Sequence, residues 1–277
     1  MSSVTAADVK SLRERTGLPM MKCKQALVEC NNDGDAAVEW LRKEGVKTQE
    51  TRLGRDTSQG RLAYFIGEDP DVGTLIELAC ESAQVASHED FRGFATDIAQ
   101  QLATGPGAAT TEELLAQDSP GKTGMTLAEQ RDEMFNRIRE VFNLNRIVRF
   151  DGTCQAYVHH DGSCGALVQY EGGNADLARD IAMHITANNP RVVAKDDLDP
   201  EAVSKEREIL ADAARKEGKP ENIIEKMIEG RMRTFYAATV LGEQPFIKDD
   251  SQTVAKVVDA AGLKIVKFVA WQMGKGN

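Results

Sequence analysis

One pattern occurs twice in this sequence and limits the folds that it can adopt: two β-rich runs joined by a turn and followed by a helix. The paired runs cover residues 60–66 with 73–78 and residues 152–158 with 165–170. Asp161-Gly162 between two such runs is a strong hairpin signal. The helices after the hairpins begin alike, as Phe94-Ala-Thr-Asp-Ile-Ala99 and Leu177-Ala-Arg-Asp-Ile-Ala182. The repeat predicts an α+β fold with a duplicated strand–strand–helix core.

Three short helices are expected ahead of the first copy. Thr5 and Asp8 have the spacing of a capping box, and Gly17 is placed to end the first helix. The turn Asn31-Asn-Asp-Gly34 precedes a third helix, which we expect to end at Gly45. These helices together predict a compact helical docking module.

After the second copy the sequence predicts two helices that pack against each other. Asp199-Pro200 is a favourable helix start, and Gly218-Lys-Pro220 predicts the turn between the helices. Apolar residues recur at steps of three and four on both sides of this turn, which favours self-packing over a cofactor groove. Residues 264–271 alternate as a strand that should join the second sheet.

The predicted organisation has six segments, and a helix over Met125–Phe142 is expected between the two copies. The segments are a docking module (1–46), a polar and partly helical linker (47–59), a first core repeat with a helical connection (60–145), a second core repeat (146–198), an inserted antiparallel helical hairpin (199–240), and a return to the second repeat that ends in the final strand (241–277).

Charge and composition exclude several functional classes. The net charge is −10 and the pI is near 5.1, so nucleic acid is not expected as the principal partner. The sequence has no apolar stretch long enough to span a membrane and no signal-peptide pattern at its start, which predicts a cytoplasmic protein without membrane binding. The five cysteines include no CxxC pair, so neither a disulfide framework nor a metal site is expected.

No candidate for catalysis is convincing. His159-His160-Asp161 resembles part of a dyad, but adjacent strand residues point to opposite faces, so these side chains should diverge. His184 should be a packed or surface helix residue rather than a ligand. Phosphate-binding glycine motifs are absent, which argues against direct nucleotide binding. In the second hairpin, Cys164 should pair with His159 and Cys154 with Gln169, so the two thiols should not meet. We expect no enzyme, cofactor or metal.

Interaction surface remains as the functional signal. Met20 and Met21 begin the second helix beside Lys22 and Lys24, and methionine is common at adaptable binding surfaces. The alternative is that the small helical core needs both methionines. The sequence favours neither.

Several motifs resemble the bacterial elongation factor Ts family, in the same order and over nearly the whole chain. They are Val9-Lys-Ser-Leu-Arg-Glu-Arg-Thr-Gly17, Met20-Met-Lys-Cys-Lys-Gln-Ala-Leu27, Leu41-Arg-Lys-Glu-Gly45, Ile181-Ala-Met-His-Ile185, Gly218-Lys-Pro220, Glu225-Lys-Met-Ile-Glu-Gly-Arg231 and Gln244-Pro-Phe246.

The resemblance implies a guanine-nucleotide exchange factor that binds elongation factor Tu·GDP and promotes GDP release during translation elongation. It also implies that the helical docking module is ubiquitin-associated-like (UBA-like) and that the inserted hairpin is a coiled coil. Elongation factor Tu is then the partner, and a homodimer or a 2:2 complex with Tu is left open. An alternative is a protein that binds and stabilises Tu with little exchange activity.

The resemblance also assigns contact residues for Tu. In the docking module these are Arg13, Met20, Met21 and Lys24, and in the core they are Ile138 and His159. An exchange loop is implied at Ser82, Ala83, Gln84 and Val85, where the family displaces the Mg²⁺ of Tu.

The chain departs from the family pattern in that loop. The family usually reads Asn-Cys-Glu-Thr-Asp-Phe-Val-Ala, and here the segment reads Ala79-Cys-Glu-Ser-Ala-Gln-Val-Ala86. Ala83 and Gln84 therefore replace an Asp-Phe wedge. A helix with which many relatives continue after the final strand is also missing.

Overall fold

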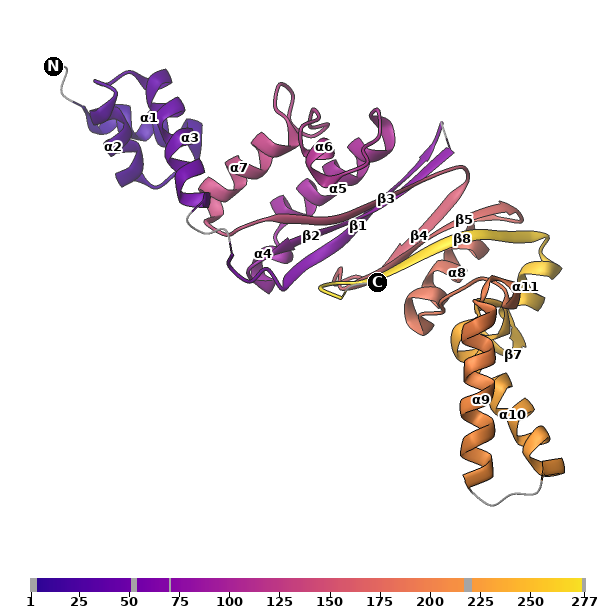
Figure 1. The fold of residues 1–277 in the computed structure, drawn as a ribbon. Coiled ribbons are helices and arrows are strands. Elements are labelled where there is room, and N and C mark those ends of the chain that lie inside the picture. The colour runs from indigo at the N-terminus through magenta and orange to yellow at the C-terminus, as the bar shows by residue number, and fades with distance from the viewer. Residues whose placement is uncertain (1–3, 51–53, 70, 217–220, 276–277) are drawn as a thin grey trace. The chain divides into compact units, whose positions relative to one another are not determined.

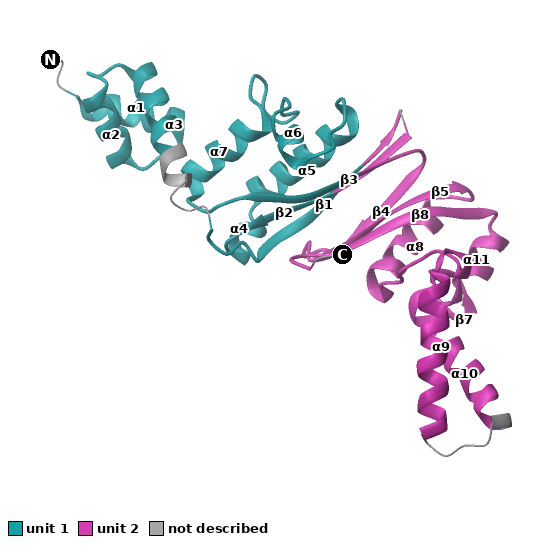
Figure 2. Cartoon of the chain, viewed as in Figure 1, with its two compact units in different colours: residues 1–65, 76–148, 276 teal, residues 66–75, 149–275, 277 magenta. Residues whose placement is uncertain are grey.

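The computed structural model describes residues 4–50, 54–69, 71–216 and 221–275, whose helices and strands are drawn in Figure 1. Its mixture of helices and sheets confirms the α+β class. The chain divides into two compact units, shown in Figure 2. Unit 1 consists mainly of residues 1–65 and 76–148, and unit 2 mainly of residues 66–75 and 149–275.

Three helices open the chain and enclose a small core of their own. They are α1 (Ala6–Thr16), α2 (Met20–Glu29) and α3 (Gly34–Glu50). The buried side chains of this core are Val9, Leu12, Leu18, Cys23, Ala26, Leu27, Ala37 and Leu41.

The predicted boundaries of these helices are correct at the start and wrong at the end. The capping box is confirmed, because Thr5 N donates to Asp8 Oδ2 at 2.9 Å and Asp8 N donates to Thr5 Oγ1 at 3.3 Å. Gly17 ends α1 in the left-handed conformation, at φ 67°. The end of α3 predicted at Gly45 is wrong, since the helix continues to Glu50. A glycine inside a helix costs only about 1 kcal/mol, which neighbouring helical turns can outweigh.

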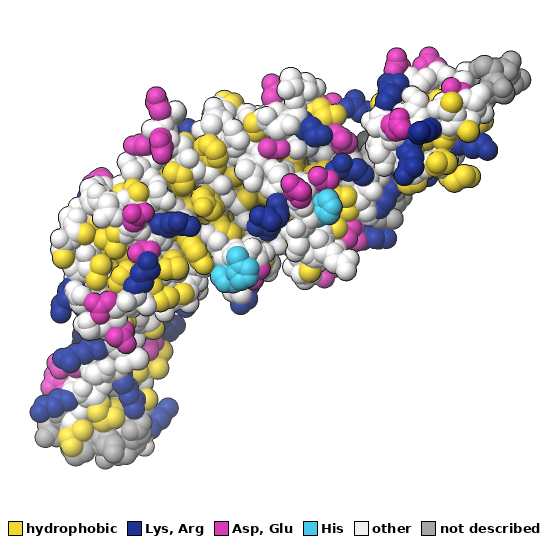
Figure 3. Space-filling view, turned by 180° about the vertical axis from the view of Figure 1, so that it is seen from behind, with side chains coloured by type: hydrophobic (Ala, Val, Ile, Leu, Met, Phe, Trp, Pro, Cys, Tyr) yellow, Lys and Arg dark blue, Asp and Glu magenta, His cyan; other side chains and the backbone are white. Residues whose placement is uncertain are grey.

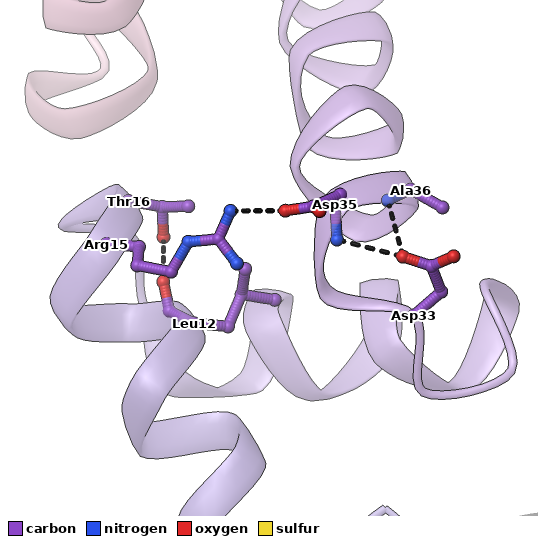
Figure 4. A network of polar contacts seen from close by, with 6 residues as sticks. All are labelled: Leu12, Arg15, Thr16, Asp33, Asp35 and Ala36. Atoms are coloured by element: carbon purple, nitrogen blue, oxygen red, sulfur yellow. Dashed lines mark hydrogen bonds and ion pairs between the residues drawn. The ribbon is translucent and has the colours of Figure 1, made fainter.

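Polar contacts join α1 to the start of α3 (Figure 4). Arg15 Nη2 lies 2.6 Å from Asp35 Oδ1. Asp33 caps α3 by accepting hydrogen bonds from the backbone N–H groups of Asp35 at 2.9 Å and Ala36 at 3.0 Å. These contacts fix the turn between α2 and α3.

The first sheet has three strands in the order β1-β2-β3. The first predicted hairpin is confirmed as β1 (Gln59–Glu68) and β2 (Asp71–Cys80). The third strand, β3 (Asn143–Asp151), was not predicted.

Helices cover one face of the first sheet (Figure 1). The longest of them, α5, buries Phe91, Phe94, Ile98 and Leu102 at helical spacing. The last, α7, stops at Ile138, where Arg139 takes a left-handed conformation at φ 69°, so the prediction of a helix reaching Phe142 is wrong. The four helices are α4 (Ala83–Ala86), α5 (Glu89–Thr104), α6 (Thr111–Leu115) and α7 (Leu127–Ile138).

The second sheet has the order β4-β5-β8 and is packed by α8. Its hairpin register is as predicted: Cys154 lies opposite Gln169, and His159 N donates to Cys164 O at 2.9 Å. The final strand pairs antiparallel with β5, as expected. The elements are β4 (Cys154–Val158), β5 (Cys164–Gly172), α8 (Ala175–Asn188) and β8 (Leu263–Gln272).

The predicted helix pair is present as α9 (Pro200–Lys216) and α10 (Glu221–Thr239), which lie side by side in Figure 1. Asp199 caps α9 by accepting from Glu201 N at 3.0 Å. Ala214, Ile224 and Met232 are buried along the pair. The turn predicted at residues 218–220 lies outside the described residues.

Short elements that were not predicted complete unit 2. They are the 3₁₀ turns η1 (Lys195–Asp197) and η2 (Leu241–Glu243), the strands β6 (Pro245–Phe246) and β7 (Asp249–Thr253), and the helix α11 (Val254–Ala260). In the part of the chain that the structure describes, none of the helices is long and apolar enough to cross a membrane.

Candidate functional site

Three of the predicted docking residues, Met20, Met21 and Lys24, lie on α2, and the fourth, Arg13, lies on α1. Met20 is 53% exposed and Met21 is 75% exposed. Lys24 and Arg13 are exposed as well. The small helical core is filled by other side chains, so the alternative that it needs both methionines is wrong. Figure 3 shows apolar and basic side chains together on this part of the surface.

Val28 extends the same surface and was missed by sequence reasoning. It is 56% exposed and follows Met21 and Lys24 at spacings of seven and four residues on α2. Residues at these spacings share one face of a helix. That spacing was the signal that could have found it. We call Met20, Met21, Lys24 and Val28 the α2 surface.

The exchange loop connects β2 to α5. Ser82 is the N-cap of α4, and its Oγ accepts from Val85 N at 3.3 Å. Ala83 and Gln84 occupy the first turn and are exposed, whereas Val85 is half-buried against the core. The loop therefore presents residues 83 and 84 outward and holds its other end in place.

Two carboxylates tie the exchange loop to the segment after α7. Glu140 accepts from Ser82 N at 3.0 Å through Oε2 and from Ser82 Oγ at 2.7 Å through Oε1. In return, Glu81 Oε1 accepts from Val141 N at 2.9 Å. We call this reciprocal pair, Glu81 and Glu140 with the groups that they bind, the carboxylate clasp.

Two further contacts support the clasp. Arg55 Nη1 lies 2.9 Å from Glu81 Oε2. The Cys80 thiol donates to Ser82 O at 3.2 Å. Burial, with a further contribution from the charge of Glu140, raises the pKa of Cys80 to about 12, so this thiol remains a donor at neutral pH.

Ile138 lies at the end of α7, two residues before Glu140. It is partly buried against the core of unit 1. The clasp therefore joins the chain segments that hold Ile138 and the exchange loop, both predicted to contact the partner. The resemblance named Ile138 and the loop as contacts, and these remain predictions. Glu81, Glu140 and Arg55 gave no sequence signal, because their pairing spans some 60 residues or, for Arg55, 26.

His159 lies just after β4, in the turn of the second hairpin. Its Nδ1 is 3.0 Å from Asp161 Oδ1. Hydrogen bonds from Ser163 N and from His159 hold the pKa of Asp161 well below its ordinary value. The rings of His159 and His160 are 4.2 Å apart, so the prediction that these side chains diverge is wrong. Both histidines lie beyond the end of the strand, where alternation no longer applies.

Other candidate residues serve the fold. His184 is buried and contacts Gln244, as expected of a packed helix residue. Over the described ranges, no group of three or more His, Cys, Asp or Glu side chains is placed to hold a metal ion.

Comparison with known proteins gives the family. The family model described as Elongation factor TS matches residues 81–275. The chain belongs to the elongation factor Ts family. It is 41% identical over 277 residues to elongation factor Ts of Methylococcus capsulatus, covering 99% of this chain and 93% of that protein. It is 41% identical to elongation factor Ts of Alkalilimnicola ehrlichii, covering 99% of this chain and 94% of that protein. It is 38% identical over 288 residues to elongation factor Ts of Prosthecochloris aestuarii, covering 99% of this chain and 100% of that protein.

Members of the elongation factor Ts family are nucleotide exchange factors for elongation factor Tu in translation elongation, not catalysts of a chemical reaction. The family match begins at Glu81, the first residue of the clasp, and includes the exchange loop, Ile138 and His159.

Proposed function

We propose that this chain binds elongation factor Tu·GDP and promotes the release of GDP in the cytoplasm. The observation that carries the proposal is the exposed α2 surface on a compact helical core, in a member of the elongation factor Ts family. In this proposal the helical docking module is UBA-like and the α9–α10 pair is a coiled coil.

The docking module holds Tu through Arg13, Met20, Met21 and Lys24. The exposed side chains of Met20 and Met21 supply apolar area. The exposed cations Arg13 and Lys24 supply charge complementarity at the rim of the interface. Ile138 and His159 add contacts from the core.

Exchange follows from differential affinity. A factor that binds nucleotide-free Tu more tightly than Tu·GDP must, by linkage, weaken GDP binding by the same factor. The exchange loop acts near the Mg²⁺ site of Tu. Here the loop presents Ala83 and Gln84. Gln84, which ends in a carboxamide, is therefore the only long side chain in the first turn of α4.

A second candidate function rests on the same loop. Ala83 has no charge and Gln84 has no ring, so the chain could hold Tu without accelerating GDP release. The first function predicts faster release of labelled GDP from Tu at micromolar factor. The second predicts a stable complex with an unchanged release rate.

Replacing the two loop residues tests the mechanism. The double substitution Ala83→Asp with Gln84→Phe should raise the saturating release rate by about tenfold, because buried interface anchors are commonly worth 1–4 kcal/mol. Stopped-flow fluorescence of labelled GDP measures this rate. Glu133→Ala, which removes a half-buried carboxylate on α7, serves as the control. No acceleration by either the unmodified chain or the double variant would exclude exchange activity.

The assembly needs its own measurement. We propose a homodimer or a 2:2 complex with Tu as the alternatives to a 1:1 complex, and sedimentation of the mixture would distinguish them by mass.

A further inference from the structure

The carboxylate clasp is a structural device at the base of the exchange loop. Each of its two chain segments supplies a side-chain carboxylate to a backbone N–H of the other: Glu140 to Ser82 at 3.0 Å and Glu81 to Val141 at 2.9 Å. The Ser82 hydroxyl adds a third bond to Glu140 at 2.7 Å. Hydrogen bonds to an ionised acceptor are roughly twice as strong as neutral ones.

We infer that Glu140 is a positioning residue for nucleotide exchange and acts through Ser82. The inference rests on the proposed function. Glu140 binds both the backbone N–H and the hydroxyl of Ser82, and that hydroxyl also caps the first turn of α4. Glu140 therefore sets the direction in which the side chains of Ala83 and Gln84 project from the loop.

The composition of the loop makes this positioning important. Ala83 cannot reach beyond its own Cβ, and Gln84 has a flexible side chain whose ordering costs free energy on binding. A loop with such residues depends on the placement of its backbone. A pre-organised backbone removes part of the ordering cost before the partner arrives.

The clasp also orders the second contact segment. Glu140 follows Ile138 by two residues, with Arg139 in the left-handed conformation between them. Arg139 N donates to Phe135 O at 2.7 Å and Val141 N donates to Glu81, so the chain is fixed on both sides of Glu140. Ile138 and the loop therefore keep one relative placement within unit 1.

A merely structural role predicts a different pattern of effects. If Glu140 only stabilised unit 1, its removal would lower the melting temperature and leave the release rate of the folded fraction unchanged. If it positions the loop, the saturating release rate falls while docking through the α2 surface is retained. The factor concentration for half-maximal release reports that docking.

The experiment is a double-mutant cycle on the full-length chain with Tu carrying labelled GDP. The variants are E140A, S82A, their combination, S82T as the conservative rescue, and E133A as a matched control, because Glu133 on α7 is a half-buried carboxylate like Glu140. GDP release is followed over a range of factor concentrations, and circular dichroism melting establishes the folded fraction. E140Q replaces E140A if the latter does not fold at the assay temperature.

We expect E140A to lower the saturating release rate by about tenfold, the effect of losing a charged hydrogen-bond acceptor, with the half-saturating concentration changed by less than about threefold. S82A should lose less, because its backbone N–H still binds Glu140. The combined variant should match E140A. S82T keeps a hydroxyl for Glu140 and should release GDP faster than S82A, and E133A should match the unmodified chain.

Three results would overturn the inference. E140A or E140Q could release GDP as fast as the unmodified chain, the effects of E140A and S82A could simply add, or S82T could release GDP no faster than S82A. An unmodified chain that never accelerates GDP release would instead refute the proposed function, and the positioning role with it.

Discussion

At the scale of single residues, His184 shows how a buried titratable group can be held in one state. Its Nδ1 accepts from Ile247 N at 3.2 Å, which leaves Nε2 to donate to Gln244 Oε1 at 2.9 Å. This pattern needs the neutral ring. Burial lowers the pKa of His184, and the hydrogen bond to Gln244 opposes that shift in part. The residue joins α8 to β6.

The stability of the chain should therefore depend on pH through His184. The folded-state pKa lies below the unfolded value, so the unfolded chain binds more protons as pH falls through about 6.5. The free energy of unfolding should decrease there, by at most about 1.4 kcal/mol per pH unit. Urea unfolding between pH 5.5 and 7.5 measures it. His184→Gln should remove this part of the pH dependence of the free energy of unfolding. The same pH dependence in both proteins would contradict the role assigned to His184.

Residue-level predictions succeeded where local rules applied. The capping box at Thr5 and the pairing of Cys154 with Gln169 follow from spacing alone. The prediction for His159 and His160 failed because strand alternation was extended past Val158, the last residue of β4. Glu140 gave no local signal, since its partner Ser82 is 58 residues away.

At the scale of elements, β3 shows why one strand was missed. Its polar residues include Asn145 and Arg146, which weaken the apolar alternation of a strand. The structure pairs both with Glu77 on β2: Arg146 Nη2 lies 2.6 Å from Glu77 Oε2, and Asn145 Nδ2 lies 2.9 Å from Glu77 Oε1. Glu77 is only 2% exposed. Tertiary pairing therefore compensates for polar residues that local reasoning counts against a strand.

Breaking this pair should destabilise the first sheet. Glu77→Ala leaves the Arg146 guanidinium without its buried acceptor, at a cost of about 3 kcal/mol in the free energy of unfolding. Chemical denaturation followed by circular dichroism measures the loss. Glu171→Ala, which removes an exposed partner of Lys264, is the control and should cost less than about 1 kcal/mol. Equal effects of the two substitutions would refute the role assigned to Glu77.

At the scale of the whole molecule, the surface proposed for docking and the loop proposed for exchange lie on different elements, α2 and the start of α4. The repeated strand–strand–helix plan and the final strand were predictable, because each has its own periodicity. The segment from η2 to α11 was not, since its elements are too short to establish a period.

Docking and exchange should therefore respond to different substitutions. Met20→Ala with Met21→Ala should raise the factor concentration for half-maximal GDP release by about tenfold or more, because exposed anchors lose their contact area. The saturating rate should stay within about twofold. Titration of labelled Tu·GDP measures both quantities, and Lys43→Ala on α3 is the control. A lower saturating release rate with an unchanged half-saturating concentration would contradict the assignment of docking to the α2 surface and of exchange to the loop.

The raised pKa of Cys80 has a consequence for oxidation chemistry. Peroxides and alkylating reagents attack the thiolate, and burial, which raises the pKa of Cys80 to about 12, keeps this side chain in the thiol form at pH 7. The donor that holds Ser82 O is thus a poor target for such reagents. Thiol-directed probes should label the half-buried Cys164 before the buried Cys80 and leave the base of the exchange loop chemically intact.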